Sequence, residues 1–185
     1  MLQDFFTQLT SFVSGLDPWQ QVPALVPVGA IPFVESYLGS FLGTLVGIHP
    51  LIAVPAAVLG NLLATFAVTA LAGGARDAVI RGRAATVPAS STPGAAVPGT
   101  ATQVATVQAA TSGRFRSKVA AALDKYGVPG VCLLGPLVVA SQITAPTLVA
   151  LGATKGRVYL WMGISILAWG MLFGLFGGAL TTLAP

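Results

Sequence analysis

The chain shows one pattern of apolar and polar positions twice. An apolar segment broken by prolines and glycines, 19–46, precedes an uninterrupted apolar span from Pro50 to Leu71. The same order returns in the broken segment 128–151 and the span from Val158 to Leu180. The two spans contain no charged residue, and at ~1.5 Å per residue each is long enough to cross a hydrocarbon core of ~30 Å. The pattern predicts two transmembrane helices, each preceded by an interrupted helical segment.

The two halves align without a gap at an offset of 104 positions. This offset places Pro32 on Pro136 and Gly73-Gly74-Ala75 on Gly177-Gly178-Ala179. Because the chain is rich in Ala, Gly and Leu, the shared order of elements is a stronger signal than the few identities. Two internal repeats with interrupted apolar segments are typical of transporters that bind their substrate at the middle of the membrane.

Composition agrees with a membrane protein. Hydrophobic residues make up 55% of the chain and charged residues only 8%, which is too few for the surface of a soluble domain. We therefore expect an all-α, multi-pass integral membrane protein. Small residues every four positions, as at Gly170, Gly174 and Gly178, predict close helix packing.

The basic residues select between two topologies. All but two lie between the halves, and the remaining pair is Lys155 and Arg157. If the broken segments are re-entrant hairpins that enter the membrane and return, all nine Lys and Arg lie on one face, as the positive-inside rule requires. The alternative of four kinked crossings divides them between two faces. We prefer the re-entrant topology, which inverts the second repeat relative to the first and makes Pro32, Pro136 and Pro146 the hairpin breakers.

This topology divides the chain into four parts. They are an amphipathic interfacial helix (1–18), a first repeat of hairpin plus transmembrane helix (19–75), a basic and flexible cytoplasmic linker (76–125), and a second repeat of the same design (126–185).

Glu35 is the main candidate for a functional residue. It is the only glutamate and follows Pro32 inside an apolar segment. An ionisable group at membrane depth is costly and usually functional. A carboxyl group that alternates between its protonated and charged forms suits proton coupling or substrate binding. Alternatively, Glu35 lies near the interface or is held by backbone donors of the broken helix. Ser36 and Tyr37 are its expected polar partners.

The second hairpin offers uncharged donors and acceptors. Ser141, Gln142 and Thr144 stand beside Pro146, where inward-facing helix amino ends would suit an anionic group. Their alternative role is to satisfy backbone groups that the prolines leave free. Lys155 and Arg157 are expected to set the topology, with lipid headgroup contacts as a second role.

Several classes of function are not indicated. One His, one Cys and one Glu provide no zinc signature, no Ser-His-Asp set and no paired carboxylates. No Gly-rich phosphate loop is present, and the basic residues are not interleaved with aromatic ones as in nucleic-acid binding. We expect no enzyme, no cofactor, no metal and no nucleic-acid partner.

Several short motifs carry a family resemblance. They are Gly29-Ala30-Ile31-Pro32 with Glu35 nearby, then Leu59-Gly60-Asn61, and finally Lys125-Tyr126-Gly127 leading into Gly135-Pro136. Together they resemble the small multidrug export protein family, a distant relative of the DedA-type membrane proteins.

The resemblance covers about Val22 to Leu180 without the linker. It implies the inverted hairpin-plus-helix architecture, and DedA-type relatives move lipid carriers such as undecaprenyl phosphate by using a membrane acidic residue and arginines. Glu35 would correspond to the acidic residue, whereas Val139, Ala140, Ser141 and Gln142 stand where the arginines are expected.

The sequence therefore predicts a small, proton-coupled transporter that moves an amphipathic substrate, such as a polyprenyl phosphate, across the inner membrane. Its partners would be membrane lipids, the substrate and protons, and the glycine stripes leave a homo-oligomer open. One alternative is an exporter of cationic drugs. Another is a scaffold or assembly factor that transports nothing and packs against a partner through its glycine stripes.

Overall fold

The computed structural model describes residues 2–85 and 101–183, with side chains described over 3–72 and 113–183. Every regular element in these ranges is a helix. In chain order they are α1 (Leu2–Ser14), α2 (Pro18–Ala30), α3 (Glu35–Leu45), α4 (Pro50–Ala85), α5 (Ala101–Leu134), the 3-10 turn η1 (Gly135–Leu137), α6 (Ser141–Ala150) and α7 (Lys155–Leu183).

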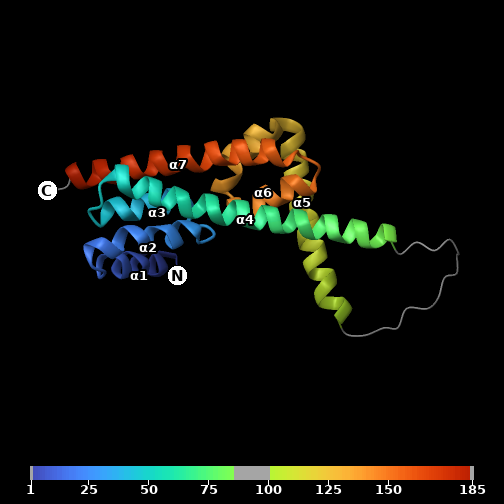
Figure 1. Cartoon of the computed structure of the whole chain (residues 1–185), viewed down its shortest axis with the longest axis horizontal. Helices are drawn as coiled ribbons and strands as arrows, with labels where there is room; N and C mark the ends of the chain where they lie inside the picture. The colour runs from blue at the N-terminus through green and yellow to red at the C-terminus, as the bar shows by residue number, and fades with distance from the viewer. Residues whose placement is uncertain (1, 86–100, 184–185) are drawn as a thin grey trace, which may run out of the picture.

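Two long helices form the axis of the molecule. The stretch Pro50–Ala72 of α4 and the whole of α7 are long and apolar enough to cross a membrane. They run in opposite directions, since Gly170 contacts Val58, Gly174 contacts Val54 and Gly178 contacts Pro50 (Figure 1). The predicted glycine stripe of α7 therefore packs against α4 and α3. Small residues on one face of a helix allow the backbones to approach this closely.

Each long helix follows a pair of shorter helical segments separated by a break. In the first half, α2 and α3 are separated by residues 31–34, which include Pro32. In the second half, the end of α5 and α6 are separated by η1, which contains Pro136, and by residues 138–140. The interruptions predicted at these two prolines are therefore present.

Other prolines do not break the chain. Pro23 and Pro27 lie inside α2, and Pro146 lies inside α6. The prediction that Pro146 is a hairpin breaker is wrong. An internal proline removes one N–H donor and displaces the carbonyl four residues earlier. The helix continues through Pro146 where its neighbours Ala145 and Leu148 are completely buried in the bundle.

The segment between the halves is more helical than expected. α4 continues to Ala85, and α5 is helical from Ala101, whereas the sequence of the linker 76–125 predicts a flexible segment over 84–113 and a basic helix over 114–125. Residues 86–100 lie outside the described residues. The stretch 101–112 has no glycine or proline and is rich in alanine, which has the highest helix propensity.

A kink divides α5 at Gly127, whose φ of 67° is accessible mainly to glycine. The part before the kink carries Arg114, Arg116, Lys118 and Lys125. Figure 1 shows this part running across the direction of α4 and α7. Its apolar side chains Phe115, Ala122 and Leu123 pack against the core of the second half.

The core consists of two clusters that share α4. One gathers Leu25, Val28 and Leu42 of α2 and α3 with Val13 of α1, which is completely buried. α1 thus packs along α2 and belongs to the first half's core (Figure 1). The other cluster gathers residues of α5, α6 and α7 with Val54 and Val58 of α4.

Candidate functional site

The two chain breaks meet inside the bundle. Glu35 is the first residue of α3, and Ser141 is the first residue of α6. The backbone N–H of Ser141 donates a hydrogen bond to Oε1 of Glu35. Glu35 is only 1% exposed and Ser141 is completely buried. The carboxylate therefore caps the amino end of a helix from the other half, where the partial positive charge of the helix dipole favours an anion.

α4 contributes two polar side chains to the same cluster. The Ser141 hydroxyl donates to Oδ1 of Asn61 at 3.0 Å and lies 2.9 Å from the Thr65 hydroxyl. The Thr65 hydroxyl is also 3.2 Å from Oδ1 of Asn61. Both side chains are completely buried. The Asn61 side chain also interacts with the carboxyl group of Glu35. The cluster therefore joins α3 and α4 of the first half to α6 of the second half, which lies more distant in the sequence.

Gln142 ties the cluster to the end of α2. Its Nε2 donates to Oδ1 of Asn61 at 3.2 Å and to the backbone carbonyl of Ala30 at 3.3 Å. Two buried polar atoms of the cluster have no hydrogen-bond partner, Nδ2 of Asn61 and Oε1 of Gln142. Buried polar atoms are satisfied in most proteins, so such exceptions need an explanation.

The cluster lies halfway along the two long helices. Asn61 is the middle residue of the apolar stretch Pro50–Ala72. On the other side, the Ser36 hydroxyl donates to the backbone carbonyl of Ile166 at 2.8 Å, within the central part of α7. The amino ends of α3 and α6 are therefore each fastened to the middle of a long helix.

The backbone at the first break is strained. Phe33 has a φ of 69° and Glu35 a φ of 52°. Residues other than glycine adopt this left-handed region at a cost of about 1–3 kcal/mol each, and such residues concentrate at functional sites. The conformation is maintained by its surroundings, because the Glu35 N–H donates to the carbonyl of Ile31 at 3.0 Å and the carboxylate is bound by Ser141.

The structure brings only some of the predicted residues together. Glu35, Ser141 and Gln142 share the cluster, and Ser36 fixes α3 to α7. The Tyr37 hydroxyl donates to the carbonyl of Phe33 at 3.1 Å.

The remaining predicted residues lie elsewhere. Thr144 is buried but donates to the carbonyl of Val139 at 3.1 Å, outside the cluster. Lys155 and Arg157 are exposed at the start of α7. They are therefore not part of the Glu35 cluster.

Because Asn61 is a polar residue in an otherwise apolar span, the sequence predicts interhelical hydrogen bonding for it, and it does not single out Thr65. The signal was present, since Asn61, Thr65 and Thr69 recur every four residues in an otherwise apolar span. That spacing places polar side chains on one helical face, and all three are completely buried in the structure.

Two pockets border the two chain breaks. One, of about 850 Å³, is lined by the break residues Ile31 to Val34 and by the start of α1. The other, of about 370 Å³, is lined by Gly135, Val138 and Val139 of the second break and by the basic part of α5, including Lys118. The first pocket reaches the residue before Glu35, and the second reaches within two residues of Ser141.

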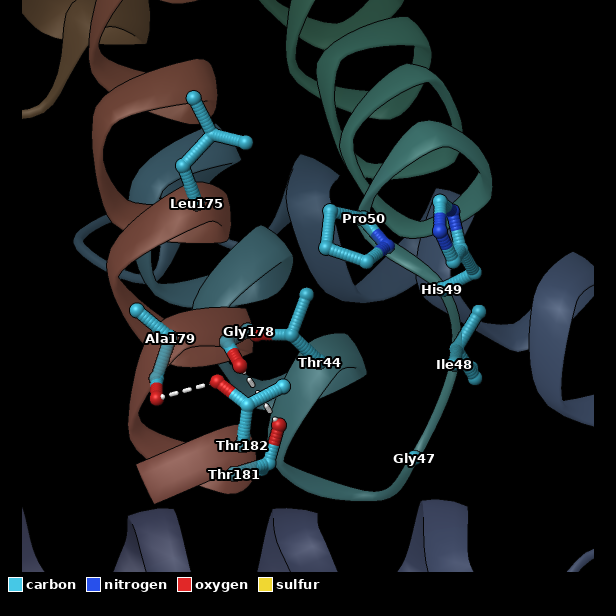
Figure 2. Close-up of a pocket in the computed structure, with 10 residues that line it drawn as sticks. All are labelled: Thr44, Gly47, Ile48, His49, Pro50, Leu175, Gly178, Ala179, Thr181 and Thr182. Atoms are coloured by element: carbon cyan, nitrogen blue, oxygen red, sulfur yellow. Dashed lines mark hydrogen bonds between the residues drawn. The ribbon is translucent and has the colours of Figure 1, made fainter.

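A further pocket lies at the start of α4, where α3, α4 and α7 end or begin. It measures about 420 Å³ and contains His49, Thr181 and Thr182 among its lining residues (Figure 2). The two threonine hydroxyls donate to carbonyls of their own helix at 2.9 and 2.8 Å. None of the predicted site residues lines it, so we assign the candidate site to the Glu35 cluster.

Within the described residues, no group of three or more His, Cys, Asp or Glu side chains could hold a metal ion. No family model matches the chain, and no curated protein or solved structure matches it. The resemblance to the small multidrug export family therefore rests on its short motifs alone, and the function has to be argued from the cluster itself.

Proposed function

We propose that this protein is a proton-coupled membrane transporter built from two inverted repeats. It would move an amphipathic substrate, a lipid-linked anion such as a polyprenyl phosphate, across the inner membrane of a bacterium. The observation that carries the proposal is the buried contact between Glu35 and the amino end of α6. It joins the two chain breaks at the middle of both candidate membrane helices, where inverted-repeat transporters bind substrate and coupling ion.

The direction of the long helices supports the inverted topology. Four successive crossings would make the second and fourth segments, α4 and α7, parallel. Re-entrant hairpins before each long helix would make them antiparallel, which is the direction that the contacts of Gly170 and Gly174 give. α3 has 11 residues and α6 has 10. At ~1.5 Å per residue, each is about half as long as a ~30 Å hydrocarbon core.

The two break pockets support a route for substrate. They are lined by residues of the two breaks that precede Glu35 and Ser141, and their linings are mainly apolar with few charged groups. In such an arrangement, substrate would reach the cluster from one break at a time while the Glu35–Ser141 contact separates the two sides. The basic residues of α5 beside the second break would attract an anionic headgroup.

A specific observation also favours the alternative of a cationic substrate. The pocket at the first break contains Phe5, Phe6, Phe33 and Phe41 together with Asp4. No Lys or Arg occurs before Arg76. Aromatic faces and a carboxylate attract organic cations. Loss of antibiotic resistance in Glu35→Gln, with unchanged movement of lipid, would support this alternative.

Labelling of single cysteines from one side of the membrane tests the inverted topology. With Cys132 replaced by alanine, cysteines at the exposed positions Asp17, His49, Ser117 and Thr154 are treated with an impermeant thiol reagent. We expect Asp17 and His49 to react from outside, and Ser117 and Thr154 to react only after the cells are opened. Labelling of Ser117 and Thr154 from opposite sides would establish four crossings and refute the inverted repeat.

Transport by Glu35→Gln tests the function itself. We expect the purified protein in liposomes to speed the movement of a fluorescent polyprenyl phosphate between leaflets under a pH gradient. Glu35→Gln should reduce the rate to that of protein-free vesicles, because glutamine cannot exchange a proton. Asp17→Asn, which removes an exposed carboxylate, should leave the rate unchanged.

The same measurement tests the scaffold alternative. A scaffold would show no transport in liposomes, and in cells that depend on the protein Glu35→Gln would be silent. Gly174→Leu would instead be damaging, since a side chain there meets Val54 and Ser40 in the helix interface. That pair of results would reject the transporter.

A further inference from the structure

We propose that the amino end of α6 is a binding site for an anionic group, and that Glu35 occupies this site when the substrate is absent. The substrate anion and the charged carboxylate would compete for the same donors. This inference rests on the proposed transport function and deepens it, because the competition is a physical means of coupling the substrate to a proton.

The donors of the site are defined by the contact that Glu35 makes. The first backbone N–H groups of a helix have no partner within the helix, and together with the helix dipole they bind anions. α6 is ten residues long, and the N–H of its first residue, Ser141, is used by a carboxylate from α3. The amino end of α6 therefore already accommodates an oxyanion, which is the side-chain carboxylate of Glu35.

A second donor in the cluster interacts with Glu35 but has no acceptor in hydrogen-bond geometry. Nδ2 of Asn61 is buried and has no hydrogen-bond partner, and the Asn61 side chain is completely inaccessible to solvent. The same side chain interacts with the carboxyl group of Glu35 and contacts Ser141 through Oδ1. A phosphate presents more acceptor oxygens than a carboxylate, so it could accept from both the Ser141 N–H and Asn61. The unused donor is explained if the resident carboxylate is smaller than the intended ligand.

The cluster also contains an acceptor for the displaced carboxyl group. Oε1 of Gln142 is buried without a donor. A protonated Glu35 carries an O–H group, which needs such an acceptor. When a monoanion enters and Glu35 takes up one proton, the net charge of the buried cluster stays the same. Two anions in this cluster would repel each other at low dielectric, so anion binding and proton uptake are linked.

The groups around Glu35 are uncharged, so Glu35 is the group of the cluster whose charge changes with pH. α4 presents Asn61 and Thr65, and α6 presents Ser141 and Gln142, all uncharged. On α7, the Ile166 carbonyl accepts from Ser36 beside Glu35, and α2 ends in the Ala30 carbonyl, which accepts from Gln142. Tyr37 on α3 is the one other titratable group among the described residues that interacts with Glu35, and its phenol is neutral at physiological pH.

Counting protons during binding tests this competition. The probe is dihexanoyl phosphatidylglycerol, a phosphodiester that stays a monoanion between about pH 5 and pH 8, compared with zwitterionic dihexanoyl phosphatidylcholine. Calorimetry on the whole chain in non-ionic detergent, in two buffers of different ionisation enthalpy, gives the protons taken up per lipid. We expect about one, and an affinity that falls about tenfold per pH unit where Glu35 is charged.

Variants separate Glu35 from other carboxylates. Glu35→Gln should bind the phosphatidylglycerol with the same affinity at every pH and without proton uptake. Asp17→Asn should behave like the unmodified chain, and Asn61→Leu should weaken binding about tenfold by removing a donor.

Three results would overturn the proposal. They are binding without proton uptake by the unmodified chain, equal binding of both lipids, and no binding of phosphatidylglycerol. The liposome experiment separates this inference from the proposed function. Proton-linked binding without transport would reject the proposed transport function and support the anion site. Transport with proton-independent binding would support the transport function and reject the competition at that site.

Discussion

Proline at position 141 is expected to destabilise the fold by about 3–5 kcal/mol at neutral pH, whereas alanine there costs only about 1 kcal/mol. Proline removes the backbone N–H that binds the Glu35 carboxylate and leaves a buried charge without its donor. Alanine keeps that N–H and removes only the hydroxyl. The comparison therefore isolates the contact between the two halves.

The helix itself should tolerate this proline. Position 141 is the first of α6, where proline is favourable. Ala140 has a ψ of 141°, which suits a residue before proline. Thermal unfolding in non-ionic detergent measures the effect. The difference between the two variants should shrink in acid, since protonation of Glu35 removes the buried charge. Equal stability of Ser141→Pro and Ser141→Ala at neutral pH would show that the carboxylate does not depend on this donor.

Leucine at position 60 is expected to prevent folding, with a cost of at least about 3 kcal/mol. A Cβ atom on Gly60 would overlap the backbone carbonyl of Val26, so α2 and α4 could not keep their present contact. A backbone carbonyl cannot rotate away as a side chain can. Separation of these helices would also withdraw Ala30 from Gln142 and open the Glu35 cluster.

Gly156→Leu is the matched control for this prediction. It makes the same substitution near the start of α7, where a Cβ atom has no neighbour within 4 Å. We expect Gly156→Leu to yield monodisperse protein with unchanged thermal unfolding, and Gly60→Leu to yield aggregated protein or none. Normal folding of Gly60→Leu would show that α2 and α4 are not in backbone contact.

The sequence was sufficient to predict the helical class, the two long apolar helices and the breaks at Pro32 and Pro136. These features follow from local physics, because a charge-free span and a proline-rich interruption depend on neighbouring residues only. The prediction at Pro146 was wrong because it depended on more than neighbouring residues. Proline lowers helix stability everywhere, but whether a helix continues through it depends on the surrounding packing.

The candidate site could be predicted only in part. Glu35 could be predicted because it is the only glutamate and lies in an apolar segment. Ser141 and Gln142 were expected to supply polar groups. The contact itself uses the backbone N–H of Ser141. An inward-facing helix amino end that suits an anion was predicted in the second hairpin, but no side-chain pattern indicates that the anion is Glu35. The role of Thr65 likewise depends on which face of α4 meets α6. That is a property of the assembled bundle and not of the span alone.

The left-handed backbone at Phe33 and Glu35 indicates that these two residues were not selected for stability alone. Glycine would adopt either φ angle almost without cost, so a chain selected only for folding would carry glycine there. It carries an aromatic residue and a carboxylate instead. The protein thus forgoes a few kcal/mol of attainable stability at one turn, which is the compromise found where activity, rather than robustness, determines the residue.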